Sequence, residues 1–341
     1  MVREFTMGPA TREAYGATLV ELGKANPNVV VVDADLSKST YTAKFGKEFP
    51  DRFFNVGIAE ANMVGIAGGL AHSGKIPFCS SFACFLVNKG YDQLRIAVAY
   101  PQENVKVVSS HGGISIGEDG PSQQSIEDVA LMCTLPGFVV CVPADEAQAK
   151  DLVRRAAAHQ GPVYLRMGRP KVAKVYDRGE FPFGKMRQLE EGTDLTIVAN
   201  GLMVAEALKA HDALKEEGIT ARVLDGYCVK PLDAEAVTRA SLETGAFVVA
   251  EEHSRYGGLG SVVAQCLAQH APAPIEQVCV EDTYAESGSP QQLLERYGLT
   301  WKHIVTAAKR VVQRKGGPTR REPPAGAADK AEESEPHPFE V

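Results

Sequence analysis

The sequence predicts an α/β protein with two doubly wound domains, each a parallel sheet with helices on its faces. Three observations lead to this prediction. Short β-branched apolar runs alternate with longer amphipathic segments, as in strand–helix–strand units. The length of 341 residues fits two domains of roughly 150 residues each. A polar, Gly- and Pro-punctuated stretch at 170–193 separates the two halves and suits a linker.

The first half opens with an amphipathic helix. The run VVVVD that follows is apolar, β-branched and closed by an acid, which is typical of a buried parallel strand. The segment AEANMVGIAGGLA is rich in small residues and predicts a second helix. Predicted helices therefore cover 10–24, 59–71 and 145–159, and predicted strands cover 29–33, 105–108, 138–142 and 163–167.

The second half repeats the alternation. Strands are predicted at 195–199, 222–224 and 246–250, and helices at 204–217 and 261–269. We therefore assign residues 1–175 to the first domain and residues 190–315 to the second. Residues 316–341 are rich in Pro, Ala, Gly and charge and have little to bury, so we expect a disordered tail.

Composition argues against several classes of protein. The chain is 44% hydrophobic and 23% charged, as in soluble globular proteins. Its net charge of -7 and the lack of a Lys/Arg block argue against a nucleic-acid or anionic-membrane surface. No apolar run approaches the roughly 20 residues that span a bilayer, and the N-terminus lacks a signal-peptide core. Seven dispersed cysteines without a CxxC motif indicate free thiols in a reducing cytoplasm.

The most informative segment is SSHGGISIGEDGPSQQSIED, residues 109–128. It follows a predicted strand and places His111, Glu118 and Asp119 among glycines. Long Gly-rich loops in compact domains are usually functional. A structural loop needs the turn residues but not these ionisable side chains, so we interpret the segment as a functional loop.

The chain resembles the transketolase family of thiamine diphosphate enzymes. The pattern Ser-His-x-Gly-x-x-x-Gly-Glu-Asp-Gly-Pro-Ser-Gln at 110–123 resembles the family's substrate loop. The resemblance extends over roughly residues 8–312, and implies a pyrimidine-binding domain followed by a transketolase C-terminal domain. Further motifs match in the same order: GIAEANM at 57–63, PFCSSF at 77–82, YDQLR at 91–95 and GRP at 168–170.

Four residues are candidates for binding the cofactor. Glu60 lies among apolar and small residues, where a carboxylate must be hydrogen-bonded or protonated; a glutamate at a helix N-terminus explains it equally well. The resemblance implies that Glu60 bonds a ring nitrogen of the aminopyrimidine and activates the cofactor. It also implies that Phe82 and Phe85 form a stacking wall, with Phe85 the direct contact, although core packing is the usual role of such aromatics. Asp35, just past a strand, is implied to lie near the cofactor.

One departure from the family limits this transfer. The segment from Phe85 to Asp92 is one residue longer than the usual pattern, so residues beyond Phe85, such as Asn88, receive no role from the resemblance.

Six residues are candidates for binding the substrate. The resemblance implies that Arg12, Ser39 and Arg169 bind a phosphate, and a guanidinium fork suits phosphate geometry. Any one of these arginines, and Arg166, which has no match in the family, could instead be a solvated arginine. The remaining candidates are His111, Asp119 and Gln123.

His111 and Asp119 are implied to contact sugar hydroxyls, and His111 is also a catalytic candidate because histidine exchanges protons near neutral pH. Gln123 stands where the family has His or Gln, and an amide binds but cannot act as an acid or base. The His, Asp and Glu spacings fit no zinc pattern, so no metal ligand is assigned. We expect no active-site residue after Arg169.

A second departure is the lack of any Gly-Asp-Gly motif, with which the family holds the pyrophosphate and Mg²⁺. The chain also begins almost directly at the pyrimidine-binding segment. We therefore expect a split enzyme, in which this chain is the C-terminal subunit of a cytoplasmic α2β2 transketolase acting on sugar phosphates. The N-terminal partner subunit would bind the pyrophosphate and Mg²⁺, while this chain positions and tunes thiamine diphosphate.

Three alternatives stay open. One is the beta subunit of a 2-oxoacid dehydrogenase, which shares a glutamate like Glu60 but needs neither paired phosphate arginines nor a GEDGPSQ loop. Another is an enzyme like deoxyxylulose-phosphate synthase. The third is a non-catalytic binding subunit, which has no use for Glu60 and the substrate residues. The pathway, pentose phosphate or a specialised sugar route, is not fixed by the fold.

Overall fold

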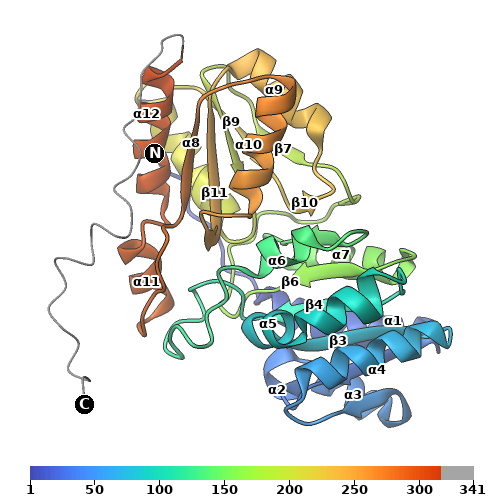
Figure 1. Ribbon diagram of the computed structural model, residues 1–341. Coiled ribbons are helices and arrows are strands. Elements are labelled where there is room, and N and C mark those ends of the chain that lie inside the picture. The colour runs from blue at the N-terminus through green and yellow to red at the C-terminus, as the bar shows by residue number, and fades with distance from the viewer. Residues whose placement is uncertain (316–341) are drawn as a thin grey trace, which may run out of the picture.

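The computed structural model describes residues 1–315 and contains two α/β units, each built on its own sheet (Figure 1). The expected disordered tail at 316–341 lies outside the described residues. Two largely parallel sheets flanked by helices confirm the predicted fold class.

The first sheet has seven strands in the order β10-β5-β6-β4-β3-β1-β2. Neighbours are parallel except β10 with β5. Val29 and Val31 of β1 pack on one face of the sheet and Val32 on the other, because side chains alternate along a strand. The strands are β1 (Val29–Asp33), β2 (Phe53–Asn55), β3 (Ile76–Phe82), β4 (Lys106–Ser110), β5 (Val139–Cys141), β6 (Val163–Arg166) and β10 (Cys228–Lys230).

Helices cover both faces of this sheet. The helices α1 (Thr11–Ala25) and α7 (Glu146–Ala158) pack on one face, and α4 (Glu60–His72), α5 (Ala83–Gln93) and α6 (Asp128–Thr134) pack on the other. Asp145 begins α7 by accepting a hydrogen bond from the Gln148 N–H. The remaining short helices are α2 (Ser37–Thr40), α3 (Ala43–Glu48), η1 (Pro50–Arg52) and the π-helical η2 (Leu94–Ala99).

The second sheet has five strands in the order β12-β11-β8-β9-β7, and only β7 is antiparallel to its neighbour. The strands are β7 (Arg187–Glu190), β8 (Leu195–Ala199), β9 (Ala221–Asp225), β11 (Phe247–Ser254) and β12 (Ile275–Val280). The helices α8 (Met203–Glu216) and α12 (Trp301–Gln313) cover one face, and α9 (Ala234–Thr244) and α10 (Leu259–His270) cover the other. The short helix α11 (Pro290–Arg296) lies beside the loop at 111–127 in Figure 1.

One strand from the second half of the chain completes the sheet of the first half. Strand β10 belongs by position to the second half but pairs with β5 of the first sheet, opposite Cys141. The stretch at 170–193, expected to be a linker, also contains β7, which forms the edge of the second sheet. One apolar cluster accordingly runs through both units, from Val32 and Met63 to Phe247 and Val263. The domain limits at 175 and 190 remain a proposal.

Most predicted elements form within one or two residues of their expected bounds, and β1 and β8 match in full. The strand expected at 246–250 continues to Ser254 as β11. Neither β3 nor α5 was predicted, because the apolar run PFCSSFACFLV shows neither period clearly. The elements α9, α12 and β12 were not predicted either. The small residues of α4 are explained by close packing, since a Cβ on Gly68 would lie 2.7 Å from the Ala97 carbonyl oxygen.

The cross-sheet strand β10 supports a prediction about stability. The Lys230 ammonium donates to the carbonyls of Cys133 (2.9 Å) and Leu135 (2.6 Å) at the C-terminal end of α6, where a cation is favoured. Replacing Lys230 with Met leaves both carbonyls without this donor, so we expect the free energy of unfolding to fall by about 2 kcal/mol. Urea unfolding measures the loss, and the exposed Lys38→Met is the control; equal stabilities would contradict the contact.

Candidate active site

The candidate residues gather at the carboxyl ends of the central strands of the first sheet. Asp35 follows β1, Phe82 ends β3, His111 follows β4 and Arg169 follows β6. These strands are parallel neighbours, so their carboxyl ends lie at one edge, where parallel α/β sheets bind ligands.

His111 occupies the middle of this edge and is only 2% exposed. Its backbone has a positive φ of 59°, and its ring lies on the Phe82 ring with centroids 3.7 Å apart. The Nε2 atom lies 3.4 Å from Arg12 Nη1. Because arginine can only donate, Nε2 accepts and Nδ1 carries the proton, which Nδ1 donates to Ser110 Oγ at 2.7 Å.

Electrostatics keep this imidazole neutral. Burial lowers the pKa of His111 to about 3, and the charges of Arg12 and Arg169 act in the same direction. At neutral pH the ring therefore offers one donor and one acceptor, and it can accept a proton only if a ligand changes its surroundings.

Arg12 links the start of α1 to the rest of the edge. Its guanidinium donates to the backbone carbonyls of Ser39 (2.8 Å) and Arg169 (3.3 Å) and lies over the Tyr41 ring. Arg12, Ser39, His111 and Arg169, which are far apart in the sequence, are thus brought into one contact network. The Ser39 contact is through its carbonyl rather than its hydroxyl.

The Arg169 side chain is bound to the functional loop. Its Nη1 donates to the Ile116 carbonyl and, at 2.7 Å, to the carboxylate of Glu118. That hydrogen bond lowers the pKa of the exposed Glu118. A carboxylate therefore already lies where the guanidinium can receive an anion. In the same loop Asp119 is exposed and Gln123 is half-buried.

Glu60 and the two phenylalanines form a second group, which meets the first at Phe82. The Phe82 and Phe85 rings are stacked with centroids 5.6 Å apart. Glu60 begins α4 and is 4% exposed. Its carboxylate lies 3.6 Å from the Lys89 ammonium, which is also 4.5 Å from the centre of the Phe85 ring. Lys89 falls in the segment that is one residue longer than the family pattern, so the sequence offered no role for it.

Asp35 lies at the periphery of the edge. It has a positive φ of 63° and exchanges two hydrogen bonds of 3.1 Å with Asn55. The neighbouring Asp33, which the sequence analysis did not select, is fully buried and accepts bonds from the hydroxyls of Thr40 and Thr42. Asp33 therefore fixes the segment that presents Ser39.

The interpretation of Arg166 as a solvated arginine is wrong. Arg166 is 5% exposed, its Nε lies 3.0 Å from the carboxylate of the fully buried Asp128, and its Nη2 donates to the Glu252 carbonyl at 2.9 Å. The signal available in the sequence was its place at the end of an otherwise apolar strand, VYLR.

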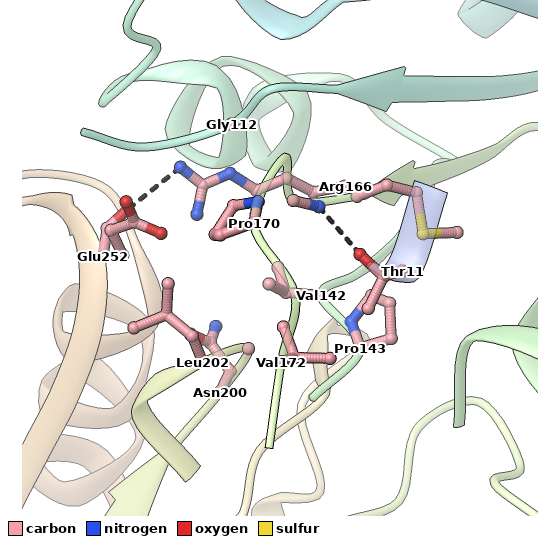
Figure 2. Close-up of a pocket in the computed structure, with 13 residues that line it drawn as sticks. Thr11, Gly112, Val142, Pro143, Arg166, Pro170, Val172, Asn200, Leu202 and Glu252 are labelled. Carbon is pink, nitrogen blue, oxygen red and sulfur yellow. Dashed lines mark hydrogen bonds between the residues drawn. The ribbon is translucent and has the colours of Figure 1, made fainter. Parts of the chain in front are cut away.

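A small cavity lies behind the site, between the two sheets. Its volume is about 30 Å³, enough for a water molecule or two. Thr11, Gly112 and Arg166 line it from the first unit and Leu202 and Glu252 from the second, and Figure 2 shows the Arg166 side chain pointing toward Glu252. Two of its lining residues are sequence neighbours of site residues: Thr11 precedes Arg12, and Gly112 follows His111.

Two further findings concern residues 1–315. No group of three or more His, Cys, Asp and Glu side chains there could hold a metal ion. No helix in that part of the chain has the length and apolar character needed to cross a membrane.

Comparison with known proteins adds independent findings. Residues 7–174 match the model of the transketolase pyrimidine binding domain, and residues 184–304 match that of the transketolase C-terminal domain. The chain is 44% identical to the 6-deoxy-6-sulfo-D-fructose transketolase subunit SqwH of Clostridium sp., over 89% of this chain and 95% of that one. It is 37% identical to mouse transketolase over 89% of this chain, but spans only 49% of the mouse protein.

A solved structure is also similar. It is described as a split gene transketolase, inactive beta4 tetramer, and superimposes with a TM-score of 0.85 at 50% identity. The match covers 90% of this chain and 100% of that one.

The buried, neutral His111 gives a prediction about pH. In the folded protein the pKa of His111 is about 3, below the ordinary 6.5. Between these two pH values His111 is therefore protonated in the unfolded chain but neutral in the native protein. The free energy of unfolding should therefore fall as pH drops from 6.5 toward 3, with a slope of at most about 1.4 kcal/mol per pH unit from this group.

His111→Asn removes that group and keeps a residue that tolerates positive φ. Urea unfolding of both proteins should show that the free energy of unfolding depends less steeply on pH between 3 and 6.5 in the variant. Above pH 6.5 the two pH dependences should be the same. Parallel curves throughout would mean that His111 titrates normally.

Proposed function

The chain belongs to the transketolase family, and we propose that it is the C-terminal subunit of a two-chain transketolase. The assembled enzyme would transfer a two-carbon ketol group from a ketose phosphate to an aldose phosphate. The observation that carries this proposal is the contact network of Arg12, His111 and Arg169 beside the Phe82–Phe85 pair, with Glu60 on the adjacent helix.

The residues fit thiamine diphosphate at its pyrimidine end. Phe85 is half-buried and stacked against Phe82, so one aromatic wall is in place for a planar ring. Glu60 would hold a proton shared with a ring nitrogen, and we propose that Asp35, at the periphery of the same edge, also contacts the cofactor. When bound, thiamine diphosphate supplies the carbon nucleophile that ketol transfer requires. Lys89, which now pairs with Glu60, has to release that carboxylate for it to meet the ring.

The substrate side fits a phosphorylated sugar. Arg169 is already paired with the exposed carboxylate of Glu118, and a substrate phosphate would exchange with this carboxylate and gain the fork geometry. We propose that Arg12, Ser39 and Arg169 bind the phosphate, that His111 binds and relays a proton at a sugar hydroxyl, and that Asp119 and Gln123 contact the sugar from the loop.

We further propose an N-terminal partner subunit in an α2β2 assembly. The sequence contains no Gly-Asp-Gly motif, so the pyrophosphate and Mg²⁺ ligands are assigned to the partner. The free state of all seven cysteines suits a reducing cytoplasm. A similar subunit is named for a sulfosugar, which favours a specialised sugar pathway as the setting over the pentose phosphate pathway.

The alternative functions explain less of the site. A beta subunit of a 2-oxoacid dehydrogenase accounts for Glu60 but not for Arg12 and Arg169 beside one another. A non-catalytic subunit explains neither Glu60 nor the two neighbouring arginines. The enzyme resembling deoxyxylulose-phosphate synthase shares the phosphate chemistry, and a donor screen that includes pyruvate separates it from a transketolase.

The first test is reconstitution. Purified alone, the chain should show no ketol transfer, and activity should appear on mixing with a Gly-Asp-Gly partner of similar size. In the reconstituted enzyme, Glu60→Gln should assemble normally but lower kcat by roughly 10² to 10⁴ or more, because proton sharing with the cofactor is lost. Turnover by the isolated chain would refute the two-chain proposal, and a near-normal kcat for Glu60→Gln would refute its role.

The second test concerns the phosphate. Losing one charged fork should raise KM for phosphorylated ketoses by about 10- to 150-fold, because the contact is made in the ground and transition states alike. Arg169→Ala should therefore lose kcat/KM on a phosphorylated ketose but not on its unphosphorylated counterpart, with the exposed Arg178→Ala as control. Equal losses on both sugars would make Arg169 a structural residue.

A further inference from the structure

The two ends of the loop at 111–127 meet inside the first unit. Gly113 N–H donates to the Ser125 carbonyl at 2.6 Å, and Gly112 N–H donates to the Met167 carbonyl at 3.3 Å. The two ends of the loop are therefore bonded to each other and to the residue after β6. These bonds do not fix the path of the loop between its ends, which depends on other contacts.

Those other contacts come from the second unit. The Glu252 carboxylate of β11 accepts the Ser115 N–H at 2.5 Å, and Ser254 N–H donates to the Ile126 carbonyl at 2.7 Å. The Gln124 side chain donates to the Glu286 carbonyl at 3.1 Å. Side chain and backbone of one strand thus hold both the outgoing and the returning arm of the loop.

Arg166 joins these parts at one buried point. Its Nη2 donates to the carbonyls of Ser125 (3.0 Å) and Glu252 (2.9 Å), while its Nε faces the Asp128 carboxylate at 3.0 Å. Arg166 and Glu252 are 5% and 6% exposed and Asp128 is fully buried. Because a buried charge is costly without close partners, this arrangement admits few alternatives.

The glycines after His111 explain how two charged side chains approach the loop. A Cβ on Gly112 would collide with the Arg166 guanidinium, and a Cβ on Gly113, which has φ +81°, would collide with the Glu252 carboxylate. The loop backbone directly after His111 therefore packs closely against the Arg166 and Glu252 side chains. These two side chains limit how the backbone that orients the imidazole can move.

We propose that the second domain positions the substrate loop, and that Glu252, with Arg166, is the positioning residue that sets the placement of His111 and Ser115. The inference rests on the proposed function for its catalytic consequence. It gives the second domain a part in a site to which the sequence analysis assigned no residue after Arg169. Glu252 itself touches no reacting atom.

A buried acid could instead serve only to hold the two units together, and the chain offers a matched control for that possibility. Glu251 is the preceding residue on β11 and is 2% exposed. Its carboxylate accepts the Leu259 and Gly260 N–H groups at the start of α10, at 2.8 and 2.7 Å. Glu251→Ala thus removes a similarly buried carboxylate, with two backbone N–H partners instead of one, from the same strand and without touching the loop.

The experiment compares Glu252→Ala and Glu251→Ala in the reconstituted two-chain enzyme. For Glu252→Ala we expect kcat/KM on a ketose phosphate to fall about 10- to 100-fold, since a buried N–H is left unpaired, while the Kd for thiamine diphosphate changes less than about 2-fold. Glu251→Ala should lower Tm but change kcat/KM less than about 3-fold. Glu252→Gln, which keeps an acceptor oxygen, should recover most of the loss.

Amide hydrogen exchange of the chain alone gives a readout that does not depend on catalysis. Exchange at 113–124 should quicken in Glu252→Ala and not in Glu251→Ala. If Glu252→Ala does not fold, Glu252→Met and Glu251→Met, which keep the side-chain volume but have no carboxylate oxygen, carry the same comparison. Equal kinetic losses, or unchanged loop exchange, would overturn the positioning role. A wild-type assembly without ketol transfer but with the expected exchange pattern would instead refute the proposed function and leave the loop contact standing.

Discussion

The buried guanidinium of Arg166 is the constraint on which the arrangement of the site depends. A buried charge needs close partners, and those available to Arg166 come from three parts of the chain: Asp128 at the start of α6, the Ser125 carbonyl and β11. Satisfying one side chain therefore brings together the end of β6, the returning arm of the loop and the second sheet. Asp128 is held in turn by the Tyr164 hydroxyl, at 2.6 Å.

The candidate site is also largely preorganised. His111 is stacked on Phe82 and fixed in one tautomer by Ser110 and Arg12, so a ligand finds its acceptor nitrogen already directed. Preorganised dipoles are the usual source of catalytic stabilisation. Under the proposed function, by contrast, two contacts would change on binding: Glu118 with Arg169 and Lys89 with Glu60. Solvent weakens both ion pairs, because Glu118, Arg169 and Lys89 are at least partly exposed, although Glu60 itself is buried.

Much of the fold could be predicted, because the residue types and periodicity within each of its central segments indicate a strand or a helix. The run VVVVD could hardly be anything but a buried strand, and the 145–159 segment carries both its helical period and its Asp145 cap. Some of the elements that were missed have mixed or short signals: β3 and α5 lie in one continuous apolar run, and β10 has three residues. The full-length helices α9 and α12 and the strand β12 were also missed. The pairing of β10 with β5 across the units is a tertiary fact, since nothing within CVK specifies a partner in the other sheet.

The sequence by itself determined the fold class, the family resemblance and the identity of the candidate side chains, because these depend on residue type and spacing along the chain. Only the tertiary structure decided how those side chains are used. It placed Arg12, Ser39, His111 and Arg169 in one network, left Asp119 and Asp35 exposed, and buried Arg166 against Asp128 and Glu252. Glu252 and Ser115 stand 137 positions apart in the sequence, so their contact exists only because two separate sheets pack together. A local pattern cannot express such a contact, because burial and charge pairing are properties of the packed molecule.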